Sequence, residues 1–297
     1  MKRFYFVLLC CLILGMQAYG QDKKKRTPTT FNKQKKTKEN DQFLQKQWWL
    51  GFKGGANVSK IDVESAYAIY SPINYDAAET GKQYDEFKHP GSQFSFEVSF
   101  YFKGFTASFQ PTFQHSRFRY TTDYTWNNSE DASEMLQTTY ASEQKVNHLL
   151  LPLILKYEVI GNKLRPYIQV GVFQAICLDA SKSITVTGID YASGGTNEFE
   201  RDPIVVGAKD LFAKYYWGLI GGAGVYYNLG NVRLNLDIQY KHGLSNIASV
   251  ENRYDNDMLV GAGDVLDDMN LNSVAVSVGC LFPMRFLTSG FKSLDRK

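Results

Sequence analysis

The sequence contains few of the residues that build catalytic and metal sites. Its 297 residues include four cysteines and four histidines, and the histidines have no metal-ligand spacing. No H-x-x-x-H, C-x-x-C or G-x-S-x-G motif occurs, although such patterns mark zinc sites, redox sites and serine hydrolases. The sequence therefore predicts a protein that is not an enzyme and that holds no metal and no cofactor.

Beyond residue 20 the chain also lacks any apolar run approaching the ~20 residues that a transmembrane helix requires, and its mean hydropathy is −0.31. The first 20 residues are different. Lys2 and Arg3 precede an apolar stretch at 4–14, and residues 18–20 (Ala-Tyr-Gly) form a small-x-small cleavage site. These features are typical of a secretory signal peptide. We therefore expect residues 1–20 to be removed from an exported protein.

Without the signal peptide the net charge falls from +3 to about +1, which gives no reason to expect a nucleic-acid partner. Residues 21–46 are nevertheless rich in lysine and poor in apolar side chains. Such a segment cannot offset its ordering entropy by burial, so we expect a disordered basic arm. It is either a solvated leader or a docking arm for an acidic periplasmic protein. The candidate docking residues are Lys23, Lys24, Lys25, Arg26, Lys35 and Lys36.

Polar and apolar residues alternate from residue 47 onwards. In the segment 232–240 (VRLNLDIQY) the odd and even positions separate into one polar and one apolar face, and 93–102 repeats the pattern. Successive side chains of a β-strand point to opposite faces, so these segments are predicted strands with one apolar and one polar face. A soluble β-sandwich would show the same alternation.

The spacing of the strands separates the two cases. Three connections are tight turns that contain glycine, at 103–104, 161–163 and 230, whereas the other four span about 20 to 35 residues. Short turns at one end and long loops at the other are typical of outer-membrane barrels. We predict an all-β, eight-stranded antiparallel up-and-down transmembrane barrel over 47–282. Both termini, including a tail at 283–297, are then periplasmic, and the long loops are extracellular. The predicted strands are 47–60, 92–102, 105–120, 144–159, 164–180, 211–228, 231–244 and 270–282.

Two segments resemble a known family. The segment 148–158 (HLLLPLILKYE) and the following 164–171 (LRPYIQVG) are similar to the L-x-x-P-L-L-L-K-Y and K-P-Y-I-G-x-G strands of the PorT-like outer-membrane β-barrel family. Residues 51–59 (GFKGGANVS) resemble its first strand, G-x-K-x-G-x-N-x-S. The resemblance implies a barrel without known catalysis, in a Gram-negative outer membrane. It also implies a link to protein export, because the family's namesake is required for a type IX-like secretion system.

Charged residues on the polar faces are the first candidate site. An eight-stranded barrel is just wide enough to be filled by its own side chains. We therefore expect these residues to form a buried ion-pair network, and the alternative is a narrow ion path. The candidates are Lys53, Glu97, Lys156, Glu158, Arg233, Asp237 and Lys241.

The long loops are the second candidate, because binding residues concentrate in loops. The fourth loop (about 245–269) is rich in aspartate, and the second carries aromatic residues with acidic ones. The acidic side chains alone favour a solvated surface beside lipopolysaccharide, with a weaker calcium alternative. The aromatic residues favour a protein contact. The candidate contacts are Tyr124, Trp126, Tyr140, Asp255 and Asp257.

These patterns favour an accessory or scaffold subunit of an outer-membrane export or assembly complex. We expect it to contact lipid, lipopolysaccharide and other membrane or periplasmic proteins. Three alternatives stay open: a small porin-like channel, a surface adhesion or binding protein, and a surface enzyme. The enzyme is the weakest, since His115 and His242 are the only histidines expected near the rim and no serine motif accompanies them.

Overall fold

The computed structural model describes residues 46–67, 81–128, 130–131, 133–159, 163–193, 195–229 and 232–284. Within these ranges the chain forms one twelve-stranded antiparallel sheet, a 3-10 helix, η1 (Lys209–Leu211), and the short helix α3 (Asp257–Gly261). The strands are β1 (Lys46–Ser65), β2 (Gln83–Tyr84), β3 (Pro90–Phe102), β4 (Phe105–Phe109), β5 (Thr112–Asn127), β6 (Met135–Glu158), β7 (Leu164–Asp190), β8 (Asn197–Glu200), β9 (Ile204–Gly207), β10 (Tyr215–Leu229), β11 (Val232–Gly243) and β12 (Asp268–Pro283).

The sheet closes into a ring. β1 pairs with β3 on one side and with the last strand, β12, on the other, and β12 continues through β11, β10, β7 and β6 back to β3. Between β3 and β6 the ring position is shared by β4 and β5, which are interrupted at Gln110 and Pro111. Proline has no backbone N–H to donate to a neighbouring strand, which is consistent with the break. The ring therefore has eight positions, which confirms the predicted fold class.

The outer wall of the ring is apolar. On β7, Ile168, Val170 and Val172 are exposed while their neighbours Tyr167 and Gln169 are buried. The same alternation leaves apolar side chains outside on β3, β6, β11 and β12. Among the described residues, no helix has the length and apolar character needed to cross a membrane.

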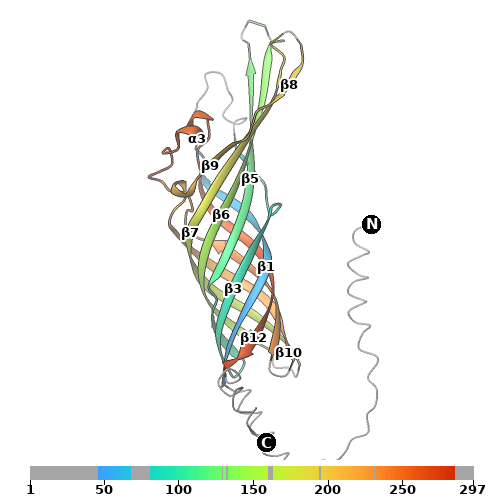
Figure 1. Cartoon of the computed structure of the whole chain (residues 1–297), viewed down its shortest axis with the longest axis vertical. Coiled ribbons are helices and arrows are strands. Elements are labelled where there is room, and N and C mark those ends of the chain that lie inside the picture. The colour runs from blue at the N-terminus through green and yellow to red at the C-terminus, as the bar shows by residue number, and fades with distance from the viewer. Residues whose placement is uncertain are drawn as a thin grey trace, which may run out of the picture. The chain divides into compact units, whose positions relative to one another are not determined.

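One end of the barrel has a tight turn between β3 and β4. Lys103 and Gly104 join β3 to β4 with φ values of 48° and 95°, the left-handed conformations that two-residue hairpin turns require. At the other end β5, β6 and β7 continue past the ring, and Figure 1 shows them rising together with β8 above the barrel. We call this projecting sheet, formed by residues 121–127, 135–142, 184–190 and 197–200, the extension.

The extension corrects the sequence prediction of long loops. The predicted second loop is a hairpin in which β5 and β6 pair from Thr112 and Leu150 to Asn127 and Met135. The predicted third loop is shortened because β7 runs to Asp190 and then pairs with β8 and β9. These segments are rich in threonine and tyrosine, which favour strands. The sixth ring strand also begins later than predicted, at Tyr215, because η1 occupies residues 209–211.

Several predicted segments lie outside the described residues. They are the signal peptide (1–20), the basic arm (21–46) with its candidate docking residues from Lys23 to Lys36, and the tail (283–297). The exceptions are Lys46, which begins β1, Pro283, which ends β12, and Met284.

Candidate functional site

The lumen contains a charge cluster at its centre. The Lys53 ammonium on β1 lies 2.8 Å from a carboxylate oxygen of Asp237 on β11 and 3.1 Å from one of Glu97 on β3. Glu97 also accepts a hydrogen bond from Lys156 on β6 at 2.7 Å. The four side chains are at most 1% exposed. β1 and β3 are neighbours in the ring, whereas β6 and β11 are not neighbours of either strand or of each other. The four side chains therefore meet inside the lumen and form a neutral cluster of two cations and two anions.

A second charge cluster lies towards the tight turns. Glu158 accepts a hydrogen bond from Arg233 at 3.2 Å and one from Thr106 at 2.8 Å, and Arg165 lies 3.7 Å from its other oxygen. The guanidinium of Arg233 also stacks over the Trp49 ring, 4.3 Å from its centroid. Cation and ring therefore fill this end of the lumen together.

Lys241 has a different environment. Its ammonium donates to the side-chain oxygens of Gln93 and Gln114 at 2.7 and 2.6 Å.

Two tyrosine rings also contribute to the lumen. The Tyr167 and Tyr226 rings stack at 4.4 Å across a β7–β10 pair, with Lys156 5.2 and 5.3 Å above them. All seven residues that were predicted to face the lumen are thus buried inside it, and their partners are amides and aromatic rings as well as opposite charges.

The fourth loop covers the mouth of the barrel through a group that we call the mouth cluster: Tyr84, Lys82, Tyr120, Lys182, Asp264 and Asp267. Lys182 on β7 pairs with Asp264 and donates to the Tyr120 hydroxyl at 2.6 Å. Asp267 accepts from Lys82 at 2.6 Å and from Tyr84 at 2.7 Å. Burial lowers the pKa of Lys182, and Asp264 acts in the opposite direction.

A small cavity of about 20 Å³ lies beside the mouth cluster, bordered by Tyr67, Tyr120 and Tyr140. It has room for roughly one water molecule. The alternation of β7 predicts that Lys182 faces inward, but only the folded loop reveals its partner Asp264.

The predicted loop contacts lie in two different settings. Tyr124 and Tyr140 lie on β5 and β6, not in a loop, and their rings meet edge to face at 5.3 Å. Trp126, also on β5, is 45% exposed near the tip of the extension. Asp255 and Asp257 do belong to the fourth loop and are both exposed; Asp255 precedes α3 and Asp257 is its first residue. The aromatic candidates are therefore held by strand pairing.

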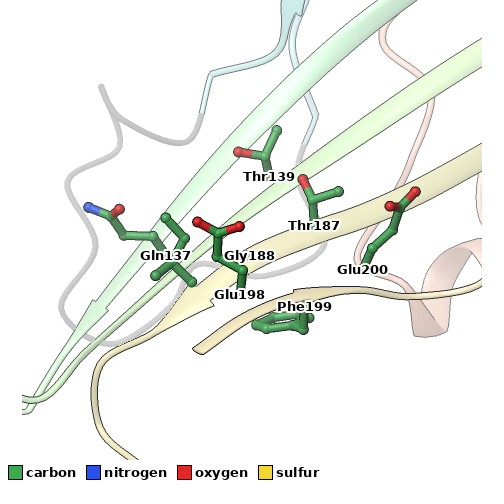
Figure 2. A pocket seen from close by; sticks show the side chains of 8 residues that line it. Gln137, Thr139, Thr187, Gly188, Glu198, Phe199 and Glu200 are labelled. Carbon is green, nitrogen blue, oxygen red and sulfur yellow. The ribbon is translucent and has the colours of Figure 1, made fainter. Parts of the chain in front are cut away.

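An open depression of about 520 Å³ lies on the extension, between β6, β7 and β8. Thr139, Thr187 and Glu200 are cross-strand partners and lie in a row, as Figure 2 shows. Glu198 and Gln137 continue the depression towards the tip. These residues were not among the predicted contacts, because their segments were expected to be loops. The alternating segment 184–188 (ITVTG) was the signal that could have revealed a strand.

The histidines of the described residues have different partners. His89 Nε2 lies 2.9 Å from a carboxylate oxygen of Asp85, whereas the rim histidines His115 and His242 contact the side-chain oxygens of Asn147 and Asn272, each at 2.7 Å. In the same described ranges, no group of three or more histidine, cysteine, aspartate or glutamate side chains could hold a metal ion. Cys177 and Cys280 are free thiols.

Comparison with curated proteins found no match. Among solved structures, the chain is similar to Neisserial surface protein A (11% identity, 78% of this chain and 96% of that one, TM-score 0.28). It is also similar to Ail of Yersinia pestis, solved with the heparin analogue sucrose octasulfate (11%, 80% and 99%, 0.25), and to the outer membrane protein AlkL (12%, 89% and 96%, 0.35). These TM-scores are too low to support any functional argument.

A family model matches most of the chain. A model described as an outer membrane protein β-barrel domain matches residues 32–249, from before β1 to the fourth loop. The match therefore includes every ring strand except β12, which closes the ring by pairing with β1 and β11. The chain belongs to the outer membrane protein β-barrel domain family.

Proposed function

We propose that this protein is a closed, non-enzymatic outer-membrane barrel that serves as an accessory or scaffold subunit of a protein export or assembly complex. In this proposal the barrel is an anchor and the extension is the docking surface. Both termini lie in the periplasm, where the basic arm contacts an acidic partner. The observation that carries the proposal is the extension, a paired sheet that continues the barrel wall above the mouth.

The filled lumen supports a role as an anchor. Lys53, Glu97 and Lys156 bridge strands across the centre, and the mouth cluster closes the outer end. An ion that entered would have to displace several buried ion pairs, whose partners would then remain uncompensated. We therefore expect no channel conductance from the folded protein in planar bilayers. Steady single-channel currents would favour the porin alternative.

The extension supports a role in docking. Binding by a preformed strand pair avoids most of the entropy cost of ordering a loop. The extension presents Trp126 near its tip and, closer to the barrel, the row Thr139, Thr187 and Glu200. Exposed aromatic side chains beside polar ones are typical of protein interfaces. The link to export rests on the PorT-like motifs at 51–59, 148–158 and 164–171.

Shortening the extension tests the proposal. Asp123 and Thr139 are cross-strand partners, so residues 124–138 can be replaced by a two-residue Asn-Gly turn that leaves the barrel intact. A photo-crosslinking residue at position 126 in intact cells reports the neighbour directly, and the same residue at position 103, in a tight turn, is the matched control. Heat-dependent gel mobility verifies that each variant is folded.

We expect an adduct from position 126 with another outer-membrane protein, and a loss of exported protein from the medium when the extension is shortened. An adduct to a molecule outside the cell, with unchanged export, would support the surface-binding alternative instead. Unchanged export with no adduct would refute the docking role of the extension.

A further inference from the structure

Four charged side chains gather on the outer wall where β5 and β6 leave the barrel. Glu143 accepts hydrogen bonds from Arg117 (3.1 and 2.5 Å) and from Arg119 (2.9 Å), and the Lys145 ammonium lies 3.8 Å away. We call these residues the rim cluster. It holds three cations around a single carboxylate, so its net charge is +2.

The carboxylate is fixed and the cations are accessible. The side chains of Arg117, Arg119 and Lys145 are 34, 40 and 49% exposed, whereas Glu143 is 18% exposed. Burial raises the pKa of Glu143, but the hydrogen bonds from the two arginines outweigh it and lower the pKa to about 2. Glu143 is therefore ionised at neutral pH, and the guanidinium groups keep donors that no carboxylate in the cluster satisfies.

The rim cluster lies just beyond the apolar band. Below it Phe113 and Leu149 are partners on the lipid-facing wall, and at the other end of β6 Tyr157 pairs with the Phe105 ring. Lys145 is 12 residues from Tyr157 along β6. With about 3.3 Å per residue and a strand tilt of about 40°, this is roughly 30 Å of height, against an apolar band of about 25 Å.

With the ring of Tyr157 at the inner edge of the apolar band, Lys145 and its neighbours lie about 5 Å beyond the outer edge of that band. They are then within a head-group layer that is roughly 5 to 7 Å thick. Long basic side chains also extend towards the membrane surface while their stems cover apolar wall. The phosphate groups of an anionic outer-leaflet lipid are at this height, and a guanidinium matches a phosphate with two parallel hydrogen bonds.

We propose that the rim cluster is a binding site for a phosphorylated lipid head group of the outer leaflet. The two arginines and Lys145 hold the phosphate, and Glu143 fixes the arginines from the opposite side. An ordinary surface ion pair has one cation for each anion and contributes little. Three cations that share one partly buried carboxylate at the membrane boundary leave charge for a ligand. The site is independent of the docking role of the extension.

The test uses the mature full-length protein, refolded in detergent micelles and titrated with bisphosphorylated lipid A, with bound lipid measured by native mass spectrometry. The variant is R117Q/R119Q. The matched control is K103Q/K214Q, which removes the same charge from exposed positions in a tight turn and directly before β10, two ring positions from β6. Dephosphorylated lipid A and inorganic phosphate are the further probes, and heat-dependent mobility confirms folding.

We expect one lipid A molecule to bind the wild type and the control equally. The R117Q/R119Q variant should bind about 25-fold more weakly, at about fivefold for each basic residue near an anionic surface. Dephosphorylated lipid A should bind the wild type no better than it binds the variant. An equal loss in both double variants, or indifference to the lipid phosphates, would overturn the proposal. Displacement of lipid A by millimolar inorganic phosphate would reassign the site to a free anion.

Discussion

Replacing Glu97 with glutamine should destabilise the barrel strongly, because two buried lysines depend on this carboxylate. Lys53 would keep Asp237 at 2.8 Å and the Gln110 oxygen at 2.8 Å. Lys156 would keep the Tyr226 hydroxyl at 2.7 Å and the two tyrosine rings, and the new amide oxygen would offer it an acceptor without charge. The side chain of Lys156 is fully buried, so its charge would have no counter-ion. Breaking a buried pair from one side typically costs about 3–5 kcal/mol.

The double variant E97Q/K156M separates the charge effect from simple damage. It removes one anion and one cation, and the Lys53–Asp237 pair remains neutral. Replacing a whole buried pair by groups of similar size is often neutral or stabilising. We therefore expect the double variant to lie within about 1 kcal/mol of the wild type, although E97Q alone loses several times more.

Reversible urea unfolding in lipid vesicles, followed by tryptophan fluorescence, measures these free energies. Trp49, which packs against Arg233 in the lumen, is one reporter. The control is S99A on the same face of β3, because the buried Ser99 hydroxyl has no hydrogen-bond partner among the described residues. If E97Q proved as stable as S99A, or if the double variant were no better than E97Q, the ion-pair account of the lumen would be wrong.

Three further outcomes follow from the geometry. A methyl group on Gly51 would lie 2.0 Å from the Cys280 carbonyl oxygen, whereas one on Gly54 would have no atom within 4 Å. G51A should therefore impair ring closure and G54A should not, and heat-dependent gel mobility measures the difference. D264N should loosen the fourth loop by weakening its pair with Lys182, and amide exchange should rise over 256–267. Burial raises the pKa of Glu143, but hydrogen bonds from two arginines outweigh it and lower the pKa to about 2. The ionised carboxylate therefore stabilises the fold above its ordinary pKa, and this contribution is lost as the pH falls from about 4.5 towards 2. The difference in unfolding free energy between the wild type and E143Q should shrink over that range.

The lumen could be predicted from the sequence because its signal is local. A period of two residues decides which side of a strand faces the lumen, and it placed Lys53, Glu97 and Asp237 inside without any knowledge of pairing. Which charge meets which is different. Lys53 and Asp237 are 184 positions apart, and their contact depends on ring order and register together.

The extension could not be predicted in the same way. Beyond Thr122, Ser142 and Val186 its side chains are exposed or half-buried on both faces, so the burial difference that marks the barrel strands disappears towards the tip. Tyr124 and Tyr140 were assigned to a loop for that reason. The rim cluster could not be predicted from the sequence for a related reason, because Arg117 and Glu143 become neighbours only through the β5–β6 register.

The buried charges also explain how the strands of the barrel specify their pairing register. A one-residue slip in pairing moves every side chain of a strand to the other face. For β3 that slip would place Glu97 in the hydrocarbon and Phe96 in the lumen, and a charge at the bilayer centre is strongly unfavourable. An apolar lumen would carry no such penalty and would leave the strands apolar on both faces. The ion pairs thus give the barrel one register at the expense of an open lumen, and they leave binding to the surfaces above it.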